Sequence, residues 1–482
     1  MRDDLQTTTE ERPTATVERF KAIAVLQYVL RKRFYAFCRY YDPTFFSDDK
    51  PHLKLICDAL QEITDGVTSH LMISMPPRSG KSYTASLWCA WTIGRGYRDS
   101  SISIMRNSYG QNLAEKFSYD IRTMLQARRF LDVFPEVALK ADHQRIEDWA
   151  VTNASESTYF CSGVGGGITG KGCKTVAIAD DLIKNLEDGL SDTITEKTWQ
   201  WYKSVHEARL LSGCPQVHIA TRWSRHDPIG MILESTESDK YKKIVIPALD
   251  DHGKSFCEAV RTTEEYLNTK NTTDEFIWEC EYMQNPIEAK GLLYPVEQLH
   301  RFSIKELAAD QISSITGFTD TADEGADFLA SLSVAVSGKK CFVIDVVFTQ
   351  EPVEITEALV SQQVIDNEHV MHRVESNSGG KGFARAVAAI LRDRGCRCKV
   401  TWQPSTQNKE TRILMSSGQV KEYFYFRNDY RPGSQYDKFM RQLTSYVKMG
   451  TNQPDDAPDA LTGAAQMVLT PSMRFLQSKG RN

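Results

Sequence analysis

Several features that mark other classes of protein are missing from this sequence. It has no apolar run of about 18 residues, and its acidic start at residues 1–4 is unlike a secretory signal, so we expect no membrane segment. Its formal net charge of −5 excludes a globally basic nucleic-acid coat. Its 11 cysteines are odd in number and lack metal-site spacing, which predicts reduced thiols in a reducing compartment.

A phosphate-binding loop is predicted at residues 74–82, between a short apolar run and a helical pattern. In such a loop the backbone N–H groups and the positive end of the helix dipole hold phosphate groups. Lys81 is expected to reach the β- and γ-phosphates of ATP, and the Ser82 hydroxyl is expected to bind Mg²⁺. Met75 stands where the usual pattern begins with glycine. The loop residues expected to contact the nucleotide are Pro77, Arg78, Ser79, Gly80, Lys81 and Ser82.

A second apolar run, at residues 175–181, predicts a buried parallel strand that ends in Asp180 and Asp181. Ligands of parallel sheets bind beyond the carboxyl ends of the strands. We therefore expect Asp180 to meet the Mg²⁺ ion held by Ser82, and Asp181 to orient or deprotonate the attacking water. Glu187 is the alternative to Asp181 as the catalytic acid.

A third strand is predicted at residues 216–221, and it runs directly into Arg222. A polar residue at such a strand end, here Thr221, can sense the γ-phosphate and pass hydrolysis on to a moving part. Arg222, and Arg78 inside the loop, are candidates for stabilising the negative charge of the transition state.

Taken together, these motifs resemble the large terminase subunit of tailed bacteriophages, the ATP-driven DNA-packaging motor and nuclease. The resemblance spans roughly residues 45–468. Asp181 departs from the family pattern, in which Glu is common, and Leu182 stands where many relatives carry Pro. The matching segments are residues 76–82, 107–118, 162–172 with the following Asp180 and Asp181, 221–223 and 282–286.

Separated acidic residues mark the C-terminal half. Asp320 and Glu375 each end a predicted strand, and the pair Asp455 and Asp456 opens the last predicted helix. Asp459 lies one helical turn later and can join the same face. A ribonuclease-H-like nuclease needs such acids, because hard oxygen ligands hold Mg²⁺ or Mn²⁺ and two ions can clamp the attacking and leaving oxygens of a phosphodiester.

This half likewise resembles the terminase nuclease domain, whose three acids map to Asp320, Glu375 and the Asp455/Asp456 pair. We take Asp456 as the catalytic member of that pair. Asp327, in a loop, and Asp345, in a strand, are weaker candidates. The resemblance implies ATP with Mg²⁺ at the first site, and two Mg²⁺ or Mn²⁺ ions at the second.

The sequence therefore predicts an α/β protein with a P-loop NTPase domain of the ASCE type, built on a mostly parallel sheet, and a ribonuclease-H-like α/β nuclease domain. A length of 482 residues suits two to three domains. The predicted parts are an N-terminal tail and helix at 1–44, the ATPase domain at 45–290, a linker at 291–312, the nuclease domain at 313–470 and a basic tail at 471–482.

The resemblance also implies partners and a location. Double-stranded viral DNA, a portal protein and a small terminase subunit are the expected partners, with several copies of the chain on the portal and no membrane. The host cytoplasm is the expected compartment. One alternative is a P-loop DNA translocase or helicase whose C-terminal domain binds DNA without cutting it. Another is a phosphoryl-transfer enzyme for a small metabolite, which leaves the C-terminal acids unexplained.

Overall fold

The computed structural model describes residues 23–168, 170–287, 290–307, 312–321, 327–377, 379–405, 407–449 and 453–469. The chain divides into two compact units. The first unit is Met1–Tyr266 with Glu279–Ile287, and the second is Leu267–Trp278 with Glu288–Asn482. The predicted basic tail at 471–482 lies outside the described residues. Among the helices of the described ranges, none combines the length and apolarity that crossing a bilayer requires.

The first unit is built on an eight-stranded sheet with the order β3-β4-β5-β2-β6-β7-β1-β8. The run from β5 to β8 is parallel, whereas β3 and β4 pair antiparallel at one edge. β2, β5 and β6 are buried along their whole length, as expected for parallel strands covered on both faces. The strands are β1 (His70–Ser74), β2 (Ile104–Ser108), β3 (Leu139–Gln144), β4 (Asp148–Val151), β5 (Tyr159–Gly163), β6 (Val176–Asp180), β7 (Gln216–Ala220) and β8 (Lys242–Val245).

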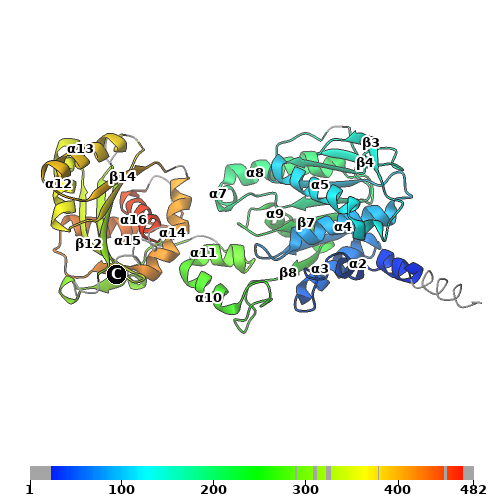
Figure 1. Cartoon of the computed structure of the whole chain (residues 1–482), viewed down its shortest axis with the longest axis horizontal. Coiled ribbons are helices and arrows are strands. Elements are labelled where there is room, and N and C mark those ends of the chain that lie inside the picture. The colour runs from blue at the N-terminus through cyan, green and yellow to red at the C-terminus, as the bar shows by residue number, and fades with distance from the viewer. Residues whose placement is uncertain are drawn as a thin grey trace, which may run out of the picture. The chain divides into compact units, whose positions relative to one another are not determined.

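Helices cover both faces of this sheet (Figure 1). Alternation along β1 shows the two layers: Leu71 and Ile73 pack with Trp88 on one face, and Met72 packs with Trp201 on the other. The first face carries α2 (Phe34–Tyr41), α3 (Pro51–Thr64), α4 (Lys81–Gly96), α5 (Gln111–Gln126) and α6 (Arg128–Leu131). On the other side lie α7 (Leu186–Leu190), α8 (Asp192–Trp201) and α9 (Pro228–Glu234).

The second unit contains a seven-stranded sheet with the order β14-β13-β10-β11-β12-β15-β9. β10, β11 and β12 form an antiparallel meander, and β13 and β14 continue it parallel to β10. This strand order is the ribonuclease-H-like arrangement that the sequence predicts. The strands are β9 (His300–Phe302), β10 (Ser314–Asp320), β11 (Leu329–Ser337), β12 (Lys340–Thr349), β13 (Met371–Glu375), β14 (Lys399–Gln403) and β15 (Phe424–Arg427).

Helices also cover both faces of the second sheet. α12 (Val353–Asp366) and α13 (Gly380–Asp393) pack on one face around Val374. α14 (Lys409–Tyr423), α15 (Gln435–Ser445) and α16 (Asp456–Val468) pack together on the other. The predicted α/β class, with a mostly parallel first sheet and a second mixed sheet, is therefore confirmed.

Two segments pack with the second unit although the sequence suggested otherwise. β9 lies in the predicted linker, yet it pairs with β15. Leu267–Trp278, which includes the end of α10 (Thr263–Thr272) and α11 (Glu275–Ile277), lies in the predicted ATPase domain. Its buried Asp274 carboxylate accepts hydrogen bonds from Lys421 at 3.1 Å and Lys448 at 3.2 Å. A buried carboxylate needs such partners, and they lie too far along the chain for a local pattern to show.

Candidate active sites

The phosphate-binding loop connects β1 to α4, and its backbone is strained. Arg78 has φ of 62° and Gly80 has φ of 90°, both in the left-handed region. A Cβ at Gly80 would lie 2.8 Å from the Phe45 ring, so only glycine suits both the backbone and the packing there. Non-glycine residues in this region cost energy and occur where a binding site imposes the shape. Arg78 is exposed at the tip of the loop.

The side chains behind the loop are suited to phosphate. Lys81 is buried, and its ammonium donates to the Thr221 hydroxyl at 2.8 Å and to the Met75 carbonyl at 3.3 Å. The buried Ser79 hydroxyl has no hydrogen-bond partner among the described residues. A cation held by neutral oxygens, and an unsatisfied hydroxyl, both gain from an anion in the loop.

Two acids at the end of β6, Asp180 and the following Asp181, lie next to the loop. The Ser82 hydroxyl donates to Asp180 Oδ1 at 3.2 Å, which joins the two residues expected to bind Mg²⁺. Asp181 has φ of 50° and accepts the Thr221 backbone N–H at 3.1 Å. Burial raises the pKa of Asp181, and the Lys81 ammonium opposes that rise. Glu187 is exposed at the start of α7, so Asp181 is better placed to act on a water molecule.

A buried arginine that the sequence did not reveal holds these metal-binding candidates. Arg106, on β2, pairs through Nε and Nη2 with Oδ2 of Asp180. The same guanidinium donates to the Ser82 carbonyl at 3.0 Å and to the Ser86 hydroxyl at 2.7 Å, and it lies 3.8 Å above the Phe117 ring. Because Oδ2 of Asp180 is taken by Arg106, Oδ1 is the oxygen that faces Ser82. Arg106 therefore sets the orientation of the Asp180 carboxylate.

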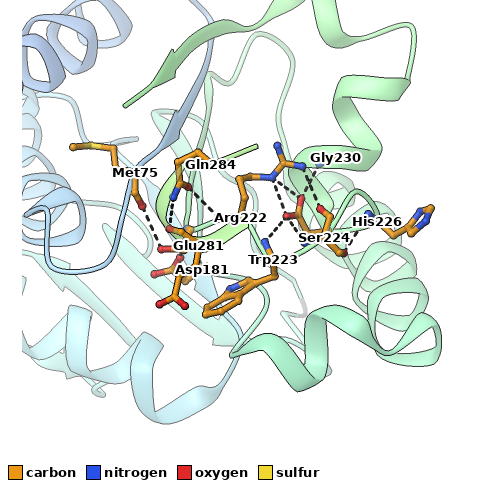
Figure 2. A network of polar contacts seen from close by, with 11 residues as sticks. Met75, Asp181, Arg222, Trp223, Ser224, His226, Gly230, Glu281 and Gln284 are labelled. Carbon is orange, nitrogen blue, oxygen red and sulfur yellow. Dashed lines mark hydrogen bonds and ion pairs between the residues drawn. The ribbon is translucent and has the colours of Figure 1, made fainter. Parts of the chain in front are cut away.

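The end of β7 connects the loop to a second polar network (Figure 2). Figure 2 shows the Arg222 side chain directed toward the turn at Ser224 and toward Gly230 in the first turn of α9. There its guanidinium forms a buried ion pair with Asp227 at 2.9 Å. Asp227 also caps α9 by accepting the Gly230 N–H at 2.8 Å. Arg222 thus fixes the turn, whereas Thr221 contacts the predicted catalytic residues directly.

The motif at 282–286, which the sequence analysis left without a role, meets this strand end. The buried Gln284 accepts the Arg222 backbone N–H at 3.2 Å through Oε1, and its amide donates to the Glu281 carbonyl. Gln284 has φ of 59°, another strained position at the site. Burial raises the pKa of Glu281, and the nearby Lys81 ammonium opposes that rise. Gln284 lies in the segment 282–286 that carries the resemblance, whereas no local pattern in the sequence marks Glu281.

In the second unit, acids from three elements approach one another. Asp320 ends β10, Glu375 ends β13, and Asp459 lies in the first turn of α16. Burial and the neighbouring Asp459 and Glu375 raise the pKa of Asp320 well above its ordinary value. Burial also raises the pKa of Asp459, to about 6, although nearby cations oppose the change. Nearby carboxylates add to the effect of burial in this way, because each negative charge disfavours another beside it.

Two cations stand among these acids. Arg412 donates to Glu375 Oε2 at 3.2 Å and pairs with Asp459 Oδ1. Lys409 lies 2.7 Å from Asp455 Oδ1 and 3.4 Å from Asp459 Oδ2. Both cations come from the first turn of α14 or just after it. They compensate charge that would otherwise be buried without a partner.

The other predicted acids lie at the edge of the cluster or outside it. The Asp456 carboxylate accepts from Gln442 at 3.0 Å, so Asp459 takes the place expected for Asp456 beside Asp320. Asp455 is held by Lys409. Asp456 and Asp459 lie one helical turn apart on the same face of α16 but are buried to different depths, which explains why Asp459 and not Asp456 lies beside Asp320.

Of the two weaker candidates, neither joins the cluster. Asp345 accepts from Gln363 and Asn367, each at 3.2 Å, and Asp327 is exposed.

The donor set suits Mg²⁺ or Mn²⁺, because carboxylate oxygens from three elements converge. As the side chains stand, no group of three or more His, Cys, Asp or Glu among the described residues has the spacing to hold a metal ion. Arg412 and Lys409 pair with carboxylate oxygens of Glu375 and Asp459 instead. Asp320, Glu375 and Asp459 would hold the ions once these cations withdraw.

No protein-family model and no curated protein matches the sequence. The large terminase of a thermophilic bacteriophage is similar in structure, with a TM-score of 0.48 and 10% identity over 88% of this chain and 99% of that chain. The structural neighbours of this chain are large terminases. The complex of the same phage protein with ADP gives a TM-score of 0.49 at 10% identity, over the same shares of the two chains. The manganese-soaked, inhibitor-bound nuclease domain of human cytomegalovirus terminase covers 36% of this chain and 92% of its own, with 13% identity and a TM-score of 0.29.

We expect Arg106→Lys to weaken binding of Mg²⁺-nucleotide by about tenfold while the protein remains folded, because lysine keeps the charge but loses the fork that orients Asp180. Titration of a fluorescent ATP analogue with and without Mg²⁺ measures this. Ser86→Ala is the matched control, since it removes another partner of Arg106 and leaves Asp180 in place. Equal loss of affinity with and without Mg²⁺ would contradict the orienting role.

The pKa of about 6 at Asp459 predicts a pH-dependent response to metal. Below that pH the carboxyl keeps its proton and cannot bind a cation, whereas above it the carboxylate is free to do so. Without metal, the folded state loses stability as the pH rises from the pKa that Asp459 has in the unfolded chain toward its folded-state pKa of about 6. Mn²⁺ should therefore raise the melting temperature more at about pH 7.5 than at about pH 5.5. Asp459→Asn should reduce the difference, and an equal shift at both pH values in the wild type would show that Asp459 is no ligand.

Proposed function

We propose that this chain is a viral DNA-packaging motor subunit. It hydrolyses ATP to move double-stranded DNA into a procapsid, and it cuts concatemeric DNA with a metal-dependent endonuclease. The observation that carries the proposal is the convergence of Lys81, Ser82, Asp180 and Asp181 at the carboxyl edge of the first sheet. A second acid cluster at the strand ends of a ribonuclease-H-like unit adds the nuclease.

The first site has the parts for phosphoryl transfer to water. Lys81 would neutralise charge on the β- and γ-phosphates, and the loop N–H groups would hold them. Ser82 and Asp180 would hold the Mg²⁺ ion, which supplies further positive charge when it is bound. Asp181 has a pKa raised by burial, so its carboxylate can accept a proton from the attacking water. Arg78, exposed at the loop tip, can reach a phosphate or a neighbouring subunit.

The second site would cut a phosphodiester bond. Asp320, Glu375 and Asp459 would hold two divalent ions, which stabilise the attacking and leaving oxygens when they are bound. Arg412 and Lys409 now neutralise these acids, so metal binding requires both cations to move. This exchange would keep the nuclease inactive until metal and DNA are both present.

Assembly and partners follow from the resemblance to large terminases and from charge. A net charge of −5 does not favour tight DNA binding by a single subunit. Several copies on a portal protein would bind the DNA together, and a small terminase subunit would deliver the DNA to them. The protein would act in the host cytoplasm and leave the procapsid after packaging.

A second candidate is a DNA translocase or helicase whose C-terminal unit binds DNA without cutting it. The observation that favours it is the pairing of the acid cluster with Arg412 and Lys409, since a permanently paired cluster would bind no metal. Metal-dependent nicking of plasmid by the full-length protein decides between the two.

Lys81→Ala should lower ATP hydrolysis by at least about 100-fold, because the charge that develops on the phosphates loses its buried counter-charge. Phosphate release measures the rate, and circular dichroism checks the fold. Lys174→Ala, at an exposed lysine of the same unit, is the control and should hydrolyse ATP at the wild-type rate. Hydrolysis by Lys81→Ala within a few-fold of wild type would exclude the loop as the ATP site.

Asp320→Ala and Glu375→Ala should abolish nicking of supercoiled plasmid with Mn²⁺ and leave ATP hydrolysis nearly unchanged, because each removes a candidate metal ligand of the second unit only. Asp459→Ala should behave alike, whereas Asp456→Ala should lose only part of the activity. Asp345→Asn is the matched control, since its carboxylate is bound by Gln363 and Asn367. Undiminished nicking by Asp320→Ala and Glu375→Ala would contradict the nuclease function and favour the translocase function.

A further inference from the structure

A pocket beside the acid cluster contains an arginine without an acidic partner. The pocket lies on the side of the second sheet that α16 covers, and its volume is about 350 Å³. Phe318 on β10, Arg373 on β13 and Gln466 on α16 contribute to its wall, as does Glu375 of the cluster. A volume in this range suits one small ligand or one nucleotide rather than a duplex.

The strand register places this pocket directly next to the acids. Phe318 and Arg373 are opposite each other in the parallel pair of β10 and β13. Asp320 and Glu375 each follow two residues later on the same strand face. Two residues of a strand span about 6.5 Å, so Arg373 lies roughly that far from the Glu375 backbone.

Close packing shapes the floor of the pocket. A Cβ at Gly463 would lie 2.1 Å from the Phe318 ring, so glycine is needed for α16 to approach the sheet this closely. Phe318 is 5% exposed and forms a buried apolar base. Gln403, Gln407 and Gln466 also line the pocket, with amide groups that both donate and accept hydrogen bonds.

The pocket is distinguished by the charge of Arg373, which no carboxylate among the described residues balances. Three other buried arginines, Arg106, Arg222 and Arg412, each hold a carboxylate. Arg373 is half-buried, and across the described parts of the chain no carboxylate pairs with it. A guanidinium remains charged at neutral pH. A partly desolvated cation of this kind gains most from an anionic ligand.

We propose that this pocket binds a backbone phosphate of the DNA strand that is cut, next to the scissile bond at the acid cluster. The proposal rests on the nuclease function proposed above and names a substrate-positioning residue for it. A guanidinium matches the geometry of a phosphate with two parallel hydrogen bonds. The three glutamines can contact the sugar or the base edge of the same nucleotide. Arg373 would fix the register of the strand so that the scissile phosphate meets Asp320 and Glu375.

The test compares full-length Arg373→Gln with Arg385→Gln. Both variants lose one positive charge in the same unit, but Arg385 is exposed on α13 with its guanidinium 5.9 Å from the Trp402 ring, outside the pocket. Binding of a short single-stranded oligonucleotide is measured by fluorescence anisotropy with Ca²⁺ at several salt concentrations. Plasmid nicking with Mn²⁺ is measured on the same preparations.

Arg373→Gln should weaken oligonucleotide binding by about tenfold and reduce the salt dependence by about one released counterion. It should raise the KM for nicking more than it lowers kcat, because the metal ligands remain. Arg385→Gln should stay within about twofold of wild type. Arg373→Lys, which keeps the charge, should restore the salt dependence and only part of the affinity. Because Arg373→Lys keeps the charge, recovery of the salt dependence in this variant shows that the defect of Arg373→Gln comes from a lost contact and not from unfolding.

Unchanged affinity, salt dependence and KM in Arg373→Gln would overturn the proposal while wild-type nicking leaves the nuclease function intact. If the wild type does not nick but its oligonucleotide binding depends on Arg373, the nuclease function fails and the phosphate site stands. Binding of inorganic phosphate that Arg373→Gln abolishes, together with oligonucleotide binding that neither phosphate nor Arg373→Gln weakens, would assign the pocket to free phosphate and overturn the DNA assignment.

Discussion

A buried carboxylate is stable only with a cation or hydrogen-bond donors beside it, and both units are organised around this constraint. In the first unit Arg106 compensates Asp180 and joins β2 to β6 and α4. In the second unit Arg412 and Lys409 compensate Glu375 and Asp459. The two solutions differ in what they leave available. Asp180 keeps one oxygen directed at Ser82, whereas Glu375 and Asp459 of the second unit are paired with Arg412 and Lys409.

The end of β7 is where the polar contacts of the first unit meet. The backbone N–H of Thr221 donates to Asp181, and that of Arg222 donates to Gln284. The Thr221 hydroxyl accepts from Lys81. Asp181 and Gln284 both have positive φ, so the two side chains that hold the strand end stand on strained backbone. Any movement of Lys81 or Asp181 on nucleotide binding acts on the same short segment that Gln284 holds.

Much of the site could be predicted because its residues follow local patterns. The loop residues, Asp180 and Asp181 stand directly after apolar strands, and parallel strands bring such ends to one edge. The same rule brought out Asp320 and Glu375. The rule did not identify Arg106, because an arginine inside an apolar strand only weakens the strand pattern and its partner Asp180 lies 74 residues away. It also failed to rank Asp456 and Asp459, since both begin the same helix and only the depth of packing separates them.

The sequence by itself determined the α/β class, the order of the elements and the two groups of acids, because alternation of apolar strands and helices and the residues at strand ends are local properties. Only the tertiary structure decided which charges meet. Arg106 pairs with Asp180, which lies 74 residues further along the chain, and Leu267–Trp278 packs with the second unit through Asp274. Ion pairs and buried hydrogen bonds join residues by distance in space and by desolvation, and neither quantity is defined until the chain has folded.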